Sequence, residues 1–207
     1  MEHWELEQEA AAAGYTAVCG VDEAGAGPLA GPVYAAAVIL PFGLELPNLN
    51  DSKQVTPKRR DRLFDLIREQ AVAWSIASVS AEEIDEIDIL NARMKAMQLA
   101  IDGLTPAADF ALIDGNRDHG SRCAIITAHE TVVKGDSRSP SIAAASILAK
   151  VSRDRYMEEL ADTYPQYRFE QHKGYPTKLH YDMLDQFGPS PVHRKTFLAK
   201  WEAKGRG

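Results

Sequence analysis

Residues 17–40 read AVCGVDEAGAGPLAGPVYAAAVIL, and this stretch decides the fold. It holds two apolar runs, 17–24 and 32–40, on either side of a connection rich in glycine and proline. Short apolar runs bounded by Gly and Pro predict buried strands. We therefore expect the domain to open with two neighbouring strands joined by a tight turn.

The rest of the chain alternates between helical and extended patterns. Apolar residues at helical spacing, with Thr56 as N-cap and Pro57 as the first helical residue, predict a helix at 57–70. Further helices are expected from Ala81 to Ile101 and over 137–161, and further strands at 72–80, 109–114 and 124–133. This alternation predicts an α/β fold with a mixed five-stranded sheet flanked by helices.

A change in composition marks the C-terminal part of the chain. After Pro165 the residues become basic and aromatic, which predicts a small C-terminal helical extension beside the sheet. We therefore expect two units, an α/β catalytic domain over 1–164 and a helical extension over 165–207.

The charge of the chain is unevenly distributed. Its 207 residues carry a net charge of -7, but residues 1–133 hold 10 Lys and Arg against 21 Asp and Glu, whereas residues 134–207 hold 13 against 9. A basic C-terminal face would suit phosphate contacts, and an ordinary solvated surface would show the same imbalance. Charge alone leaves both interpretations open.

Composition also restricts the class of protein and its compartment. Hydrophobic residues make up 45% of the chain, which excludes intrinsic disorder. The longest apolar run, 33–40, is too short for a membrane helix, and the acidic N-terminus differs from a signal peptide. Cys19 and Cys123 lie in separate apolar runs, as expected for reduced thiols. We expect a soluble, cytoplasmic protein with no membrane association.

Four carboxylates stand where predicted elements begin or end. Asp22 and Glu23 belong to the first strand, Asp114 closes the fourth, and Asp136 is expected to open the long helix. Carboxylates that converge at the ends of parallel strands repel one another unless a divalent cation lies among them. The pattern therefore favours a site for Mg²⁺ or Mn²⁺, although each aspartate taken singly is better explained as a cap or turn residue.

A dinucleotide-binding site is the first alternative for the glycine-rich connection. Gly25, Gly27 and Gly31 approximate the spacing of a phosphate-binding turn after a strand. Pro28 and Pro32, however, interrupt the helix that has to begin there, so the pyrophosphate would meet no helix N-terminus. The pattern disfavours this alternative.

Six segments together resemble one known family, bacterial ribonuclease HII. They occur in the family's order and cover nearly all of residues 18–197: GVDEAGAGPLAGPV (20–33), NDSKQVTPKRRDRL (50–63), LIDGN (112–116), VKGDSRSPSIAAASILAKVSRDRYM (133–157), HKGYPTKLHYDML (172–184) and GPSPVHRKTF (188–197).

This resemblance implies a ribonuclease-H-like fold whose C-terminal extension binds substrate. It implies endonucleolytic cleavage of the RNA strand in RNA–DNA hybrids and incision at single ribonucleotides in duplex DNA. The matching motif positions imply catalytic and metal-binding roles for Asp22, Glu23, Asp114 and Asp136. They also imply a phosphate contact for Lys53 and a contact between Tyr175 and the sugar that follows the ribonucleotide.

The expected chemistry is hydrolysis assisted by two metal ions. Two ions about 4 Å apart would activate a water and stabilise the leaving 3′-oxygen, giving 5′-phosphate and 3′-hydroxyl ends. Asp22 is the best candidate to bridge both ions. Glu23 reaches the same site only if the strand twists or ends, because neighbouring strand residues point to opposite faces.

One position departs from the family pattern. Where the resemblance implies a Gly-Arg-Gly turn that reads the ribonucleotide 2′-hydroxyl, this chain has Gly25, Ala26 and Gly27. The glycines remain and the cation is missing, so we expect weakened activity. A catalytically impaired module that binds hybrids is therefore the alternative to the endonuclease.

The expected partners are RNA–DNA hybrid and ribonucleotide-containing duplex DNA, bound by a monomer. A sliding-clamp partner cannot be read from the sequence. Lys150 and Arg153 are more often part of a solvated face than of a nucleic-acid clamp. Phosphate contacts on the substrate face are considered for the three C-terminal histidines, His172, His180 and His193.

Overall fold

Five strands form one mixed sheet in the order β3-β2-β1-β4-β5. The computed structural model describes residues 4–47, 49 and 56–205. The strands are β1 (Val18–Ala24), β2 (Val33–Ile39), β3 (Ala73–Val79), β4 (Phe110–Asp114) and β5 (His129–Val132). The predicted mixed five-stranded sheet is confirmed, and its fifth strand is shorter than expected.

The register of the sheet sets the position of the carboxylates. β2 runs antiparallel to β1 and β3, whereas β4 runs parallel to β1 and β5. Val21 pairs with Ile113, so Asp22 and Asp114, the next residues of these two parallel strands, lie side by side. The convergence expected of parallel strand ends is therefore present.

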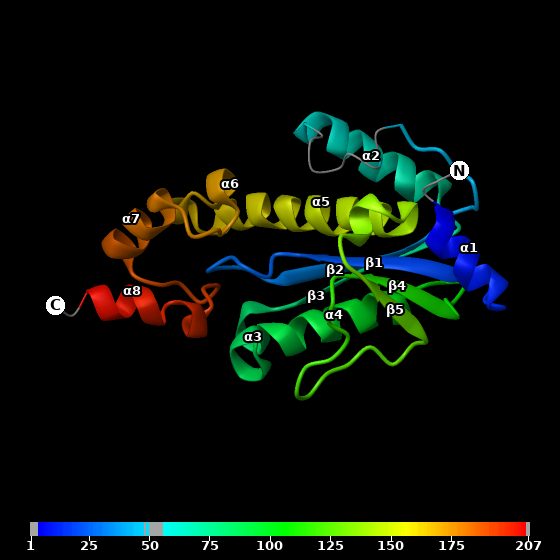
Figure 1. Cartoon of the computed structure of the whole chain (residues 1–207). Coiled ribbons are helices and arrows are strands. Elements are labelled where there is room, and N and C mark those ends of the chain that lie inside the picture. The colour runs from blue at the N-terminus through cyan, green and yellow to red at the C-terminus, as the bar shows by residue number, and fades with distance from the viewer. Residues whose placement is uncertain (1–3, 48, 50–55, 206–207) are drawn as a thin grey trace.

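Helices cover both faces of the sheet, as Figure 1 shows. On one face lie α1 (Glu5–Ala12), α2 (Pro57–Gln70) and the long α5 (Pro140–Thr163); on the other lie α3 (Ala81–Ile87) and α4 (Ile89–Asp102). Each face has its own buried apolar cluster. At Gly20, a Cβ would overlap the backbone of Ser141 and Ile142, so this glycine lets α5 lie directly on β1.

Asp88 divides the helix that was expected from Ala81 to Ile101. Its φ of 68° ends α3, and its side chain accepts a hydrogen bond from the Asn91 N–H at 3.0 Å to cap α4. An N-cap aspartate in a non-helical conformation starts a new helix, which the apolar spacing alone did not reveal.

The prediction that Asp136 opens the long helix is wrong. Asp136 lies in the short 3₁₀ helix η3 (Gly135–Ser137), and α5 begins only at Pro140. The Ser139 hydroxyl accepts the Ile142 N–H at 3.1 Å, so Ser139 is the N-cap. Proline suits the first helical position because its missing N–H is not needed there.

The C-terminal elements extend from the end of α5, at the left of Figure 1. They are η4 (Pro165–Tyr167), α6 (Phe169–His172), α7 (Lys178–Phe187), η5 (Lys195–Phe197) and α8 (Ala199–Lys204). Their apolar cluster includes Met157 and Leu160 of α5 and Leu29 before β2. The helical content agrees with the sequence, while the division into two units at Pro165 stays a prediction.

Within the described part of the chain, no helix is both long and apolar enough to cross a membrane.

Candidate active site

Asp22 lies in the second half of β1, two residues before its end, and is 7% exposed. Its Oδ1 accepts the Glu23 N–H at 2.7 Å, and the Ser146 hydroxyl of α5 hydrogen-bonds to the same carboxyl. Burial, together with the charges of Glu23 and Asp114, raises the pKa of Asp22 well above its usual value. Asp22 is thus a buried carboxyl with the carboxylates of Glu23 and Asp114 close to it.

Glu23 joins this site and is paired with a residue that the sequence analysis missed. Its Oε1 lies 2.5 Å from Nη2 of Arg93, which comes from α4 on the opposite face of the sheet. Burial raises the pKa of Glu23, the Arg93 charge opposes that rise, and Asp114 adds to it. The only local signal for Arg93 was a cation between the buried residues Ala92 and Met94.

Asp114 connects β4 to the segment that carries Asp136. Its Oδ1 accepts the Gly135 N–H at 2.6 Å, and Asp136 follows directly and is 6% exposed. All four predicted carboxylates therefore come from three neighbouring segments at one end of the sheet.

The donor chemistry of this site fits a hard divalent cation. Within residues 4–47, 49 and 56–205, no three His, Cys, Asp or Glu side chains form a group that holds a metal ion. The candidate residues are nevertheless all carboxylates, and the charges of Glu23 and Asp114 both disfavour ionisation of buried Asp22. A bound cation would remove that repulsion, and carboxylates are the ligands that Mg²⁺ and Mn²⁺ prefer.

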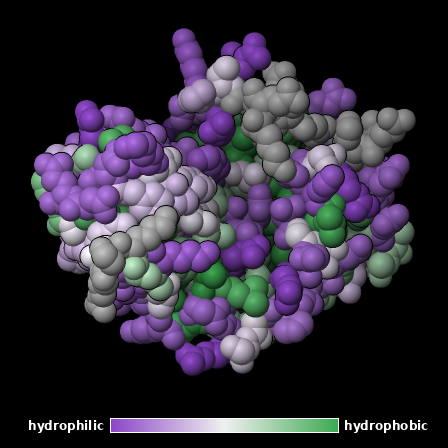
Figure 2. Space-filling model, turned by 60° about the vertical axis from the view of Figure 1, so that its left-hand side comes forward, coloured by the Kyte–Doolittle hydropathy of each residue, from purple (hydrophilic) through white to green (hydrophobic). Residues whose placement is uncertain are grey.

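A groove of about 460 Å³ adjoins the carboxylates. Its lining residues come from the end of β1, the turn that follows, α2, α5 and the C-terminal region: Glu23, Ala24, Gly25, Ala26, Gly27, Arg60, Ser146, Ile147, Lys150 and Tyr175. The molecular face in Figure 2 is largely hydrophilic and hollowed near its centre. The predicted turn and Tyr175 therefore line one groove, whereas Lys53 lies outside the described residues.

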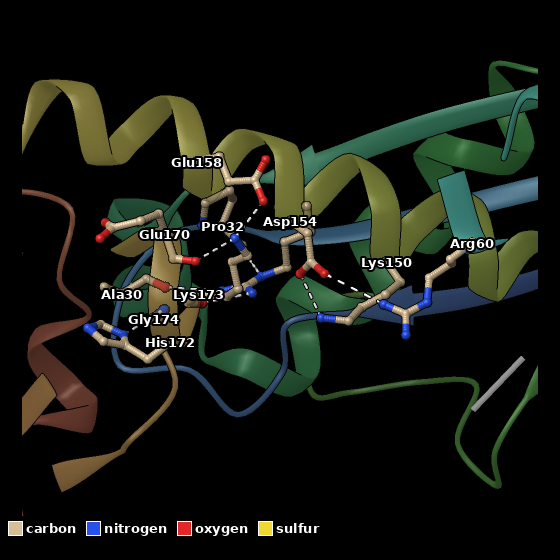
Figure 3. A network of polar contacts seen from close by, with 11 residues as sticks. Ala30, Pro32, Arg60, Lys150, Asp154, Glu158, Glu170, His172, Lys173 and Gly174 are labelled. Atoms are coloured by element: carbon tan, nitrogen blue, oxygen red, sulfur yellow. Dashed lines mark hydrogen bonds and ion pairs between the residues drawn. The ribbon is translucent and has the colours of Figure 1, made fainter. Parts of the chain in front are cut away.

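Two cations of the groove share one carboxylate, as Figure 3 shows. Lys150 Nζ lies 2.6 Å from Asp154 Oδ1, and Arg60 Nη1 lies 3.9 Å from Asp154 Oδ2. Asp154 thereby holds the α2 and α5 cations together beside the groove.

The Tyr175 ring is 36% exposed and lies near two cations. Lys150 Nζ is 5.8 Å and the Arg153 guanidinium carbon 5.5 Å from the ring centroid. The exposed part of Tyr175 faces the groove that it lines.

Comparison with known proteins decides the family. The family model described as Ribonuclease HII matches residues 19–202. The chain belongs to the ribonuclease HII family. A ribonuclease HII from Shouchella clausii is 54% identical over 194 residues, which are 94% of this chain and 73% of that relative. The chain is therefore an endoribonuclease, of a family that cleaves the RNA of RNA–DNA hybrids.

Solved structures confirm the ribonuclease-H-like α/β fold. Ribonuclease H2 from Pyrococcus horikoshii is similar with a TM-score of 0.74 at 25% identity, over 92% of this chain and 99% of that one. Ribonuclease HII of the PCNA complex from Archaeoglobus fulgidus gives 0.73 at 25% identity, over 87% and 94%.

Arg153 is buried, whereas the sequence favoured a solvated face for it. It is 0% exposed and donates to the carbonyl oxygens of Pro32 (3.1 Å), Ala30 (3.2 Å) and Lys173 (3.0 Å). Figure 3 labels the three residues that supply these carbonyls. The prediction for Arg153 was wrong because its guanidinium is buried by segments distant in sequence.

The C-terminal histidines are also buried, which excludes the phosphate contacts considered for them. His172, His180 and His193 are 7%, 0% and 2% exposed. Nε2 of His180 lies 3.0 Å from Nε2 of His193, and His172 Nε2 lies 2.8 Å from the Tyr167 carbonyl oxygen. These rings form a polar core in the C-terminal region.

Proposed function

We propose that this ribonuclease HII cleaves RNA–DNA hybrids and also incises duplex DNA at single embedded ribonucleotides, leaving 5′-phosphate and 3′-hydroxyl ends. The observation that carries the proposal is the position of the carboxylates. Buried Asp22 and its neighbours Glu23 and Asp114 crowd together directly beside the groove lined by Gly25, Ala26 and Gly27.

The carboxylates are the residues that would hold the metal ions. Asp22, Glu23, Asp114 and Asp136 provide an all-oxygen donor set suited to Mg²⁺ or Mn²⁺. When bound, two such ions supply an activated water and stabilise the leaving oxygen. The protein holds this set in place through Ser146 on Asp22, Arg93 on Glu23 and the Gly135 N–H on Asp114.

The other groove residues would bind and orient the nucleic acid. The backbone of Gly25, Ala26 and Gly27 would approach the ribose, and the exposed part of the Tyr175 ring would pack against the sugar that follows. Lys150 and Arg60 would face phosphates. Lys53 is proposed as a further phosphate contact from its motif alone. Since all these groups belong to one chain, we infer that a monomer suffices.

Cleavage of defined duplexes tests this proposal. We would compare an end-labelled DNA duplex containing one ribonucleotide, a uniform RNA–DNA hybrid and an all-DNA duplex, each with Mg²⁺, Mn²⁺ or a chelator. We expect metal-dependent cleavage of the first two and none of the third, with 5′-phosphate at the new end. Binding of both ribonucleotide substrates without cleavage under any metal would instead support the impaired binding module. For the variant Asp136→Asn, Asp162→Asn at an exposed site on α5 is the matched control, because it removes the same charge away from the groove.

A further inference from the structure

Arg194 lies behind the Gly25–Gly27 turn, although it is far from that turn in sequence. It is 0% exposed. Its Nη2 donates to the Gly25 carbonyl oxygen at 2.7 Å and its Nη1 to that of Ala26 at 3.0 Å. Its Nε donates to the Gly31 carbonyl oxygen at 2.9 Å. One guanidinium thus holds the start and the end of the connection between β1 and β2.

The two hydrogen bonds to Gly25 and Ala26 determine the direction of two N–H groups. A trans peptide unit is planar, so its C=O and the N–H of the next residue point in opposite directions. With the carbonyls of Gly25 and Ala26 turned toward Arg194, the N–H groups of Ala26 and Gly27 point away from it. The same three turn residues line the groove. Among the described residues, neither N–H has a hydrogen-bond acceptor.

The turn is held on a second side by Arg153 of α5. Gly25 has a φ of +94°, and a Cβ there would overlap the Arg153 side chain, so glycine is needed for this contact. Arg153 also donates to the carbonyl oxygens of Ala30 and Pro32. Two buried guanidiniums, from α5 and from the C-terminal segment, therefore enclose residues 25–32.

Among the described residues, neither Arg153 nor Arg194 has a carboxylate partner within ion-pair distance. Burial, and then the charge of Arg153, lower the pKa of Arg194 to about 9, so Arg194 still carries its charge at neutral pH. A charged donor makes stronger hydrogen bonds to carbonyls than a neutral one. Backbone contacts from residues 29–31 to the same C-terminal segment reinforce the arrangement: Gly31 N to Val192 O at 2.9 Å and Arg194 N to Leu29 O at 2.8 Å.

We propose that Arg194 is a positioning residue for ribonucleotide recognition, because it orients the N–H groups of Ala26 and Gly27 toward an oxygen acceptor, the ribose 2′-hydroxyl. This inference rests on the proposed function of the groove. It makes the C-terminal segment part of the specificity apparatus as well as part of the fold. The orientation of these N–H groups matters more in this chain because Ala26 provides no side-chain cation, so the backbone alone would recognise the ribose.

A ratio of affinities separates positioning from a merely structural role. We would measure Kd for a duplex with one ribonucleotide and for the matched all-DNA duplex. Cleavage is prevented by a divalent ion that does not support it, or by the Asp136→Asn substitution. Arg194→Lys keeps the charge and cannot donate to three carbonyls in the same geometry. We expect the preference for the ribonucleotide duplex to fall about tenfold, as for the loss of one or two hydrogen bonds.

Leu184→Ala is the matched control. Leu184 is 1% exposed in the same C-terminal cluster and, as an apolar side chain, makes no hydrogen bond to the turn. We expect this variant to destabilise the region while the hydrogen bonds of Arg194 remain. A preference that falls equally in Arg194→Lys and Leu184→Ala, or in neither, would overturn the inference. If the parent protein itself shows no preference, the proposed function of the groove fails instead.

A measurement on the unmodified protein keeps the inference testable even if Arg194 variants do not fold. The amide resonances of Ala26 and Gly27 are expected to shift on addition of the ribonucleotide duplex and to remain in place with the all-DNA duplex. If Arg194→Lys folds, hydrogen exchange at these two amides should also be faster, because the turn is no longer held by the Arg194 hydrogen bonds. Identical shifts with both duplexes would overturn the assignment.

Discussion

The hydroxyl of Ser139 donates a 2.6 Å hydrogen bond to Oε1 of Glu7, 132 positions earlier in the chain. Both residues are buried, and Oε2 of Glu7 has no hydrogen-bond partner among the described residues. Since Ser139 also caps α5, this bond ties α1 to the start of α5, close to the segment that carries Asp136. The N-terminal helix thereby supports the site from a distance.

Ser139→Ala should destabilise the protein more than the loss of an ordinary cap. The cap contributes about 1 kcal/mol, and a buried acceptor left with a weaker partner costs about 1–3 kcal/mol more. The matched control is Ser80→Ala, which removes the cap of α3 without any bond to a buried carboxylate. Urea unfolding gives both values. Equal losses for the two variants would show that the bond to Glu7 adds nothing.

Asp136→Asn should fold normally and lose activity. The substitution preserves the shape of the side chain and removes a charge from the proposed metal site, so turnover should fall by at least about 10²-fold, as when one electrostatic contribution to the transition state is lost. Circular dichroism checks the fold, and a single-turnover cleavage assay over a range of Mg²⁺ concentrations checks the rate. Unchanged turnover at saturating Mg²⁺ would remove Asp136 from the site.

Tyr175→Ala should affect the single-ribonucleotide substrate more than the uniform hybrid. Loss of ring stacking costs about 1–3 kcal/mol by analogy with bases on aromatic rings. Tyr175→Phe keeps the ring and its position near Lys150 and Arg153, so it should retain most of the activity. The comparison is kcat/KM on both substrates for all three proteins. Equal losses on both would mean that Tyr175 only packs against the protein.

Ala26→Arg should raise activity on ribonucleotide-containing DNA. A charge-assisted contact to phosphate contributes about 1.5–3 kcal/mol, or roughly one to two decades in kcat/KM. The two flanking glycines already shape the turn, and Arg194 already holds its carbonyls. Side-by-side assays at several salt concentrations test this, because phosphate contacts weaken with salt. Equal rates for both forms would show that the turn acts through its backbone alone.

The histidine core predicts acid sensitivity of the C-terminal region. Burial, followed by the charge of His172, lowers the pKa of His180 to about 4 from 6.5, and burial lowers that of His193 to about 4. The unfolded chain binds these protons first, so the contribution to stability is complete above pH 6.5 and is lost as the pH falls toward 4. The loss should reach about 3 kcal/mol for each ring, at about 1.4 kcal/mol per pKa unit.

Two measurements check that prediction. Tm should fall steeply between pH 6 and pH 4, and the ring resonances of His180 and His193 should not titrate until the pH is well below 6. A midpoint for either ring near 6.5, the ordinary value for histidine, would contradict the buried neutral pair.

Local features of the sequence determined most of the secondary structure and the identity of the carboxylates. The strand that carries Asp22, the helix that begins at Pro57 and the aspartate that ends β4 were all predicted within a residue or so. Such features are encoded by neighbouring residues, since a short apolar run predicts a buried strand and proline suits the first turn of a helix. The motif order then sufficed to indicate the family, because its segments recur in sequence.

Tertiary structure alone decided which charged groups serve the site and which are buried behind it. The sequence could not show that Arg93 pairs with Glu23, that Arg153 and Arg194 turn inward to backbone carbonyls, or that the C-terminal histidines form a core. These contacts join segments up to 169 positions apart. A long cationic side chain has donors that water or backbone carbonyls can accept, and only the packing of distant segments provides a ring of carbonyls.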